Sequence, residues 1–354
     1  MRINRKAVLE AAKQAAKATK ASFMASFDVI KLEGKGAYLY VTGTSQKLSI
    51  ERRIHHGEQF ESIYVNPGMF SGILDRMQDA DVELSVIDKK SASIKGGGMS
   101  LKMALFGETT WMGTRTIGDL LHETTVKADI LKSRVDGVYH AIGSNNPGML
   151  SVFLEFDGKG AVRATALDGY RISVRGGDMQ VEFSAVVEAS LLKEIIPLLS
   201  GDVTVSLYDE AMVLNCEGTT VTMVLTQKKY WDVSRFLDSS KITRSVSGSR
   251  DDLLNAVGAA LLLDKRLILD FKEDGTLMMQ TRSSTGDDFD VSFGYIGEPI
   301  RERMALNGAF LMDALQSMRE VDPITIGFTN AKSPCFIKAD GITEMMLPIT
   351  VASA

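Results

Sequence analysis

The sequence repeats one order of segments three times, and this repetition limits the fold more than any other feature. Helix-like segments begin at Asn66-Pro67, Glu188 and Asn307, so their starts are separated by 122 and 119 residues. Asn66 followed by Pro67 is typical of a helix N-terminus, with a capping side chain before a proline at the first helical position. Each helix is followed by β-like runs that alternate around a turn, over residues 82–106, 203–225 and 324–349.

A second set of helix-like segments lies earlier in each unit, starting at Asn4, Asp129 and Ser249. Each of these segments contains an early pair of apolar residues, which starts at position 8, 130 or 253. The next helix of the same unit starts 58, 58 and 54 residues after these positions. A period of about 120 residues is the size of a domain and too long for a solenoid unit. We therefore predict an α+β protein of three tandem similar domains, at residues 1–122, 123–243 and 244–354.

Composition and charge exclude several classes of protein. The net charge of −5 argues against a chain that grips nucleic acid over its whole surface, although a local basic face remains possible. No apolar run approaches the roughly 18 residues of a membrane span, and the first residues lack the apolar stretch of a signal peptide. Cys216 and Cys335 lie far apart in strand-like runs, as expected of buried thiols in a reduced, cytosolic protein.

The sequence offers no convincing catalytic or metal site. Glycines 96–98 favour a hairpin turn over a phosphate loop, because a further strand follows them and no GK[ST] is present. His55, His56 and Glu58 lie in a polar segment without a complementary ligand cluster. We expect no catalytic residue, no metal and no cofactor.

Residues 162–174, VRATALDGYRISV, predict a β-hairpin around Asp168-Gly169, a dipeptide suited to a tight turn. A purely structural hairpin is the simplest interpretation. Tyr170, Arg171 and Ile172 nevertheless combine an aromatic, a guanidinium and an aliphatic side chain, a mixture enriched in protein-recognition surfaces.

Residues 166–172, ALDGYRI, resemble the ATDGHRL signature of the bacterial DNA polymerase sliding clamp, the β subunit of the replicase. The three repeats match that family's layout, so the resemblance covers the full length. It implies a clamp fold in which two chains join head to tail as a ring, with helices lining the hole and sheets outside. It also implies a cytoplasmic, non-catalytic processivity factor that encircles duplex DNA without reading its sequence. The implied partners are a replicative DNA polymerase, a clamp loader, repair proteins and a second copy of the chain.

The family's peptide pocket has counterparts in several segments of this sequence. Residues 230–236, YWDVSRF, resemble the family's FPDYRRV segment, and residues 346–349, MLPI, resemble its VMPM segment. Asn307 and Phe310 match its N-x-x-Y pattern. The resemblance therefore implies a peptide-binding groove made by Leu150, Leu167, Gly169, Tyr170, Arg171, Ile172, Trp231, Arg235, Phe236, Asn307, Phe310, Met345, Met346, Leu347, Pro348 and Ile349.

Each piece also has a simpler explanation. Phe310 fits the core face of a helix, residues 345–349 fit a final strand, and Arg235 fits a surface charge. The chain departs from the family motif at Leu167, Tyr170 and Trp231, where the family has threonine, histidine and proline. Its tail, 350–354, lacks the usual Arg-Leu ending. These departures indicate a divergent clamp with its own peptide preference.

The first predicted helix carries Lys6, Lys13, Lys17 and Lys20 on one face, opposite an alanine-rich face. A solvated amphipathic helix explains this stripe as well as contact with phosphates does. In the family such helices face the DNA, and the loop at 144–146 is a weaker candidate for the same role. In the second predicted domain, Lys132, Arg134 and Lys193 offer similar charge and are further DNA-facing candidates.

Ring closure in the family pairs the first domain of one chain with the third domain of the other. The candidate residues are Leu101 and Met103 in SLKMAL, and Leu262 and Leu263 in GAALLLDK. A buried core position explains the leucines equally well.

Two rival functions remain open on sequence grounds. An enzyme built from repeats, such as a hydrolase or a sugar-binding enzyme, would need a nucleophile or an acid–base pair that the sequence does not show. A structural or scaffold ring could keep the same fold without DNA.

Overall fold

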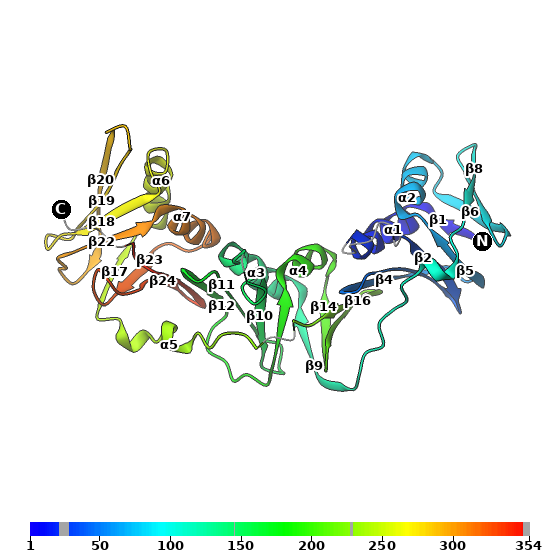
Figure 1. The fold of residues 1–354 in the computed structure, drawn as a ribbon, viewed down its shortest axis with the longest axis horizontal. Coiled ribbons are helices and arrows are strands. Elements are labelled where there is room, and N and C mark those ends of the chain that lie inside the picture. The colour runs from blue at the N-terminus through cyan, green and yellow to red at the C-terminus, as the bar shows by residue number, and fades with distance from the viewer. Residues whose placement is uncertain (21–27, 145, 227–228, 350–354) are drawn as a thin grey trace. The chain divides into compact units, whose positions relative to one another are not determined.

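The computed structural model describes residues 1–20, 28–144, 146–226 and 229–349 (Figure 1). Asn145 and the tail at 350–354, both singled out in the sequence, lie outside these residues. The chain is mixed α+β, as predicted, and its helices and strands recur in the predicted order. Among the described helices, none has the length and apolar character that crossing a membrane requires.

The bounds of the elements are as follows. The first repeat contains β1 (Arg2–Asn4), α1 (Arg5–Lys20), β2 (Ile30–Lys35), β3 (Tyr38–Thr44), β4 (Leu48–His55), β5 (Phe60–Val65), α2 (Pro67–Arg76), β6 (Asp81–Asp88), β7 (Ser91–Gly96), β8 (Met99–Ala104) and the 3-10 turn η2 (Glu108–Thr110). The second contains β9 (Leu120–Lys127), α3 (Ala128–Val138), η3 (Tyr139–Ala141), β10 (Ser151–Phe156), β11 (Val162–Leu167), β12 (Arg171–Arg175), β13 (Phe183–Glu188), α4 (Ala189–Ile195), η4 (Ile196–Leu198), β14 (Asp202–Tyr208), β15 (Ala211–Cys216) and β16 (Thr219–Val224). The third follows α5 (Ser234–Leu237) and η5 (Ser239–Lys241), with β17 (Arg244–Gly248), α6 (Arg250–Ala260), β18 (Arg266–Phe271), β19 (Thr276–Arg282), β20 (Asp288–Gly294), β21 (Ile296–Gly297), β22 (Glu302–Asn307), α7 (Gly308–Ser317), β23 (Ile324–Phe328), β24 (Cys335–Ala339) and β25 (Ile342–Met346).

The predicted helix starts are confirmed, and side-chain caps explain them. Asn66 accepts a hydrogen bond from the Met69 amide at the start of α2, and Asn307 accepts one from the Ala309 amide at the start of α7. The Ser249 side chain caps α6 in the same way. These caps satisfy backbone N–H groups that a helix leaves without an internal partner.

The chain forms two compact units, and each combines one four-stranded sheet with one larger sheet. Unit 1 comprises Met1–Leu131, Gly158–Gly160 and Ser190–Gln227, and unit 2 comprises Lys132–Asp157, Ala161–Ala189 and Lys228–Ala354. Unit 1 holds the sheets β1-β6-β7-β8 and β5-β2-β3-β4-β16-β15-β14-β9. Unit 2 holds β20-β19-β18-β22 and β13-β10-β11-β12-β25-β24-β23-β17-β21.

The strands of the second repeat are shared between the two units. In each unit, the larger sheet joins some of them to strands of another repeat. In unit 1, β4 pairs antiparallel with β16, from Thr219 opposite Arg52 to Met223 opposite Leu48. In unit 2, β12 pairs antiparallel with β25, from residue 171 opposite residue 346 to residue 175 opposite residue 342. The three-domain boundaries at residues 122 and 243 describe the sequence repeat and remain a prediction.

The core of unit 1 depends on the alanine-rich face of α1, which lies directly on β3. Ala11, Ala12 and Ala15 are buried on the predicted alanine-rich face, and Ala18 is buried as well. Gly43 in β3 lies so close to this helix that a Cβ placed on it would be 1.9 Å from the Ala15 carbonyl oxygen. Small residues on both sides therefore set the distance between the helix and the sheet.

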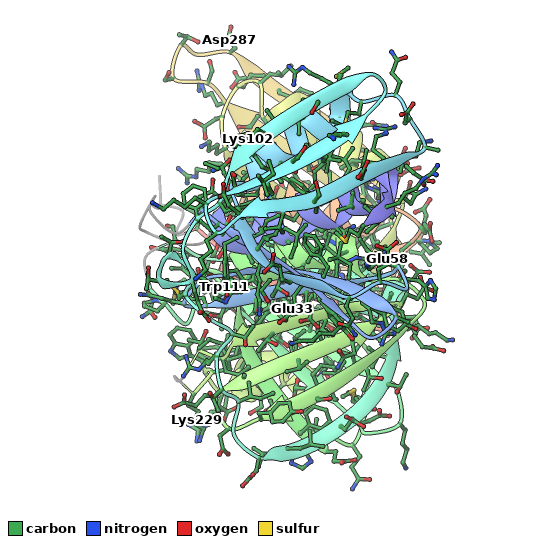
Figure 2. All side chains as sticks on the ribbon, turned by 90° about the vertical axis from the view of Figure 1, so that its right-hand side faces the viewer. Glu33, Glu58, Lys102, Trp111, Lys229 and Asp287 are labelled. Atoms are coloured by element: carbon green, nitrogen blue, oxygen red, sulfur yellow. The ribbon has the colours of Figure 1, made fainter. Side chains whose placement is uncertain are left out.

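Strand β2 shows how the larger sheet of unit 1 separates its two faces. Ile30 and Leu32 enter the core with α1 and α2, while Lys31, Glu33 and Lys35 alternate onto the opposite face, where Figure 2 labels Glu33. Burial raises the pKa of Glu33, but hydrogen bonds from Lys35 and Lys31 outweigh this and lower the pKa to about 2. This face of the sheet is polar.

We expect Gly43→Ala to destabilise unit 1 by about 1–3 kcal/mol, because the new methyl group would overlap the Ala15 carbonyl and push α1 from the sheet. The free energy of unfolding, measured by urea denaturation, checks this. Gly294→Ala in β20 is the matched control, since its added Cβ would meet no atom within 4 Å. Equal stability of the two variants would contradict the packing described here.

Candidate functional site

The hairpin of β11 and β12 is formed as predicted, and Asp168 shapes its turn. The Asp168 carboxylate accepts hydrogen bonds from the backbone amides of Tyr170 (2.9 Å) and Arg171 (3.0 Å). Gly169 adopts φ +94°, a conformation that glycine reaches without the strain of a side chain. The turn leaves the Tyr170 side chain 65% exposed.

Arg171 is buried and joins the hairpin to α7. Its Nε donates to Asp168 Oδ2 (2.9 Å), its Nη1 donates to Asp313 Oδ2 on α7 (2.6 Å), and its Nη2 donates to the His140 carbonyl oxygen. The guanidinium also lies 4.2 Å from the ring centroid of Phe310. All contacts named here are internal to unit 2, so Arg171 holds its neighbours in place and is not a free surface charge.

The segment after β25 crosses from the hairpin to the four-stranded sheet of unit 2. The Leu347 amide donates to the Tyr170 carbonyl (2.9 Å), and the Ile349 amide donates to the Ala305 carbonyl (2.7 Å). Leu347 and Ile349 are each more than one-third exposed, and Pro348 between them is half-buried. The segment therefore presents two aliphatic side chains beside Tyr170.

The segment that includes α5 covers part of the nine-stranded sheet. Tyr230 is buried, with its ring stacked on Phe153 at 5.1 Å between centroids. Val233 and Leu237 pack on a small core made by Leu167 and its neighbours. The segment and the sheet border a hollow of about 830 Å³, which Trp231 and Tyr230 help to line.

Trp231 lies where the family motif has proline, and it packs on a glycine. A Cβ placed on Gly148 would be 2.6 Å from two atoms of the indole, so the ring lies against the Gly148 backbone. Trp231 is 39% exposed, and Phe236 on α5 is more exposed still.

The predicted groove residues fall into three groups. Leu150, Tyr170, Trp231, Arg235, Phe236, Leu347 and Ile349 are exposed. Asn307, Phe310 and Pro348 are half-buried. Leu167, Arg171, Ile172, Met345 and Met346 are buried and support the surface from beneath, while Gly169 forms the turn.

A backbone hydrogen bond and a cation–π contact join some of these residues directly. Tyr170 meets Leu347, and Arg171 meets Phe310, whereas Asn307 acts at the N-cap of α7. Arg235 and Phe236 belong to α5, which is tied to the sheet through Val233 and Leu237.

The sequence interpretation missed Asp313, His140 and Phe153 as supporting residues. The helical spacing of Phe310 and Asp313, three residues apart on one face of α7, was the signal available for Asp313. No local signal marked His140, because its partners lie far away in the sequence.

The proposed DNA-facing lysines of α1 are partly engaged within unit 1. Lys13 Nζ lies 3.2 Å from Asp75 Oδ1, and Lys17 Nζ lies 3.6 Å from Glu194 Oε2. Lys6, Lys20 and Lys193 are exposed, whereas Lys132 and Arg134 on α3 are half-buried. The basic stripe is therefore weaker than the sequence alone indicated, and its contact with DNA remains a prediction.

The candidate ring-closure residues differ in exposure. Met103 is buried in the core of unit 1, and Leu101 packs against the same core. Side chains alternate along β8, so Lys102 between them is exposed (Figure 2). This corrects the expectation that the Met103 side chain faces a partner. Leu262 is 86% exposed just after α6, and Leu263 is half-buried.

Comparison with known proteins supports the family resemblance. Residues 1–107 match the model of the DNA polymerase III beta subunit, N-terminal domain. No curated protein sequence matches the chain.

Solved clamp structures match the whole chain in fold. A putative DNA polymerase III beta subunit from Eubacterium rectale is 22% identical with a TM-score of 0.90, and 99% of each chain is covered. A Pseudomonas aeruginosa DNA polymerase sliding clamp with ligand is 18% identical with a TM-score of 0.91, and a Thermotoga maritima beta subunit is 17% identical with a TM-score of 0.87; both matches cover 99% of each chain. The whole chain therefore has the sliding-clamp fold, with low sequence identity.

A buried ion pair lies in the interior of unit 2. Arg175 Nη2 lies 2.5 Å from Glu344 Oε1, and both residues are almost completely buried, at 3% and 1% exposed. The Ser173 hydroxyl donates to the same carboxylate oxygen (2.9 Å), and His140 Nε2 lies 3.2 Å from Glu344 Oε2. Gly137 on α3 makes room for Arg175, since a Cβ there would be 2.7 Å from the arginine Cγ.

These contacts keep Glu344 ionised. Burial alone would raise the pKa of Glu344, but the hydrogen bond from His140 and the charge of Arg175 outweigh burial and hold the pKa below its ordinary value. A lowered folded-state pKa means that the carboxylate contributes stability above its unfolded-state pKa. That contribution is lost as pH falls through the folded-state pKa.

We expect Glu344→Gln to destabilise unit 2 by about 3–5 kcal/mol at neutral pH, because it leaves Arg175 buried without a counter-charge. Urea denaturation measures the change. The control is Asp288→Asn, which removes the exposed partner of Arg282 at 3.4 Å and should change stability by less than about 0.5 kcal/mol. An equally small effect at Glu344 would show that the buried pair is not needed.

Proposed function

We propose that the chain is a DNA sliding clamp, a non-catalytic, cytoplasmic ring of two copies that encircles duplex DNA without reading its sequence. The observation that carries the proposal is the sliding-clamp fold over 99% of the chain at a TM-score of 0.90, together with the family match of residues 1–107. The clamp needs no cofactor of its own. It tethers a replicative DNA polymerase to its template and is placed on DNA by a separate clamp loader.

Ring closure in this proposal uses sheet edges and an exposed leucine. Strand β8 ends the four-stranded sheet of unit 1, and β20 ends the four-stranded sheet of unit 2. Pairing such an edge with a second copy would satisfy backbone groups that otherwise invite aggregation. Leu262, beyond the end of α6, supplies an apolar side chain whose exposure a partner would relieve.

Weak contacts with DNA suit this function, because a closed ring retains DNA by topology. The exposed Lys6 and Lys20 supply sequence-independent attraction to phosphates. The ion pairs of Lys13 with Asp75 and of Lys17 with Glu194 reduce that attraction. A moderate basic face is what sliding requires.

Partner proteins dock through the surface around Tyr170, Phe310 and Leu347. It offers aromatic and aliphatic side chains on a framework fixed by Arg171, suited to an extended peptide with Leu and Phe anchors. A Pseudomonas aeruginosa sliding clamp of the same fold has been solved bound to griselimycin. That structure supports a ligand site on this fold.

The ring predicts twice the chain mass of 38.6 kDa and a hollow particle in small-angle X-ray scattering. Leu262→Asp should shift the particle towards the mass of one chain, because a charge would be buried at the joint. Ile296→Asp is the control, since Ile296 is 78% exposed on β21 and lies outside the proposed joint. A compact wild-type monomer would contradict the ring.

Retention on DNA separates a clamp from a scaffold ring of the same fold. After a clamp loader and ATP have placed the wild-type protein on a nicked circular plasmid, the protein should co-elute with the circle and be lost when the plasmid is linearised. Retention on neither form would favour the scaffold function.

Phe310→Ala should weaken binding of a fluorescein-labelled peptide with Leu and Phe anchors by about 1–3 kcal/mol, since a half-buried aromatic on the Arg171 guanidinium has the character of a hot spot. Fluorescence anisotropy gives the affinity. Leu120→Ala removes an exposed apolar side chain on β9 in unit 1 and should leave affinity unchanged. Unchanged affinity in Phe310→Ala would contradict the assigned surface.

A further inference from the structure

His140 makes two contacts that point in different directions. Its backbone carbonyl, in the single turn η3, accepts a hydrogen bond from Arg171 Nη2. Its ring Nε2 lies 3.2 Å from Glu344 Oε2. One residue thus connects the buried ion pair of Arg175 and Glu344 to the arginine beneath the candidate peptide surface.

The direction of the second contact follows from the chemistry of Glu344. An ionised carboxylate only accepts hydrogen bonds, so His140 Nε2 must carry the proton and donate. The other carboxylate oxygen is occupied by Arg175 Nη2 and the Ser173 hydroxyl. The acceptor is therefore held by β12 and cannot turn away, and it fixes the orientation of the imidazole.

The contact of the imidazole with Glu344 anchors the residue whose carbonyl oxygen accepts from Arg171. Arg171 distributes its donors over three elements: Asp168 in the hairpin, the His140 carbonyl in η3, and Asp313 in α7. A guanidinium is planar, so acceptors on three sides determine its plane. The central carbon of the guanidinium lies over the Phe310 ring, 4.2 Å from the ring centroid.

We infer that His140 is a positioning residue, which holds Arg171, and through it Phe310, in the geometry of the peptide-binding surface. The effect of His140 on peptide binding rests on the proposed function. The coupling of His140 to Arg171 does not depend on that function. The role requires a side chain at position 140 that can donate a hydrogen bond to Glu344 Oε2, as His140 Nε2 does.

The test compares His140→Leu, which keeps the bulk and removes the donor, with His140→Gln, whose side-chain amide restores a donor. His140→Leu should weaken the fluorescein-labelled Leu/Phe peptide about tenfold, the scale of one hydrogen bond to a charged group, and His140→Gln should recover most of the loss. His55→Leu, at an exposed histidine of β4 in unit 1, is the matched control and should bind as the wild type does.

A second readout does not depend on any peptide. The side-chain Nε–H resonance of Arg171, observed by NMR, should be sharp in the wild type and in His140→Gln and broadened in His140→Leu. Thermal melting confirms that each variant is folded.

The outcomes separate the two proposals. Equal peptide affinity of His140→Leu and wild type, or equal loss in both His140 variants, would overturn the positioning role. If no form binds the peptide while the Arg171 resonance still follows the donor at position 140, the peptide site is wrong and the coupling is right. An Arg171 resonance unchanged in His140→Leu would overturn the coupling itself.

Discussion

The antiparallel pairing of β12 with β25 is the contact on which unit 2 depends. It joins strands from the second and third repeats into one nine-stranded sheet. Both faces of β12 are buried. Ile172 and Val174 face the small core beneath α5, while Arg171, Ser173 and Arg175 face the side of α3, η3 and α7.

The ion pair of Arg175 and Glu344 gives this pairing one register. A shift of one residue would turn the Glu344 side chain to the opposite face, away from Arg175, because side chains alternate along a strand. A buried ion pair is weak evidence of stability, since the desolvation of two charges offsets much of their attraction. Its effect here is specificity, because a slip of one residue would leave two charges buried without partners.

Much of the fold could be predicted because its signals are local. The caps at Asn66 and Asn307, the turn at Asp168-Gly169 and the alanine face of α1 each act within a few residues. The spacing of the repeats then gave the order of elements.

The interior of the site could not be predicted in this way. Nothing local in the RISVR sequence of β12 indicates that both of its arginines are buried. The partner of Arg175 lies 169 residues further along the chain, and a second acceptor of Arg171, Asp313, lies 142 residues away. The prediction that Met103 faces a partner was wrong for a related reason. The sequence SLKMAL shows which residues share a face, but only the contact with the core shows which face is turned inward.

The departures from the family motif can be understood through the same geometry. Leu167 is buried against the α5 segment, where it enlarges the apolar core that holds Val233 and Leu237. The Tyr170 side chain is not needed to hold the turn. The Tyr170 amide donates to the Asp168 carboxylate and its carbonyl accepts from the Leu347 amide, so backbone hydrogen bonds hold the turn. Trp231 can replace proline because Gly148 leaves its backbone open to the indole. At the proposed peptide surface these substitutions would change which side chains meet a ligand, while the supports at Asp168 and Arg171 stay in place. The surface chemistry can therefore diverge without disturbing the framework.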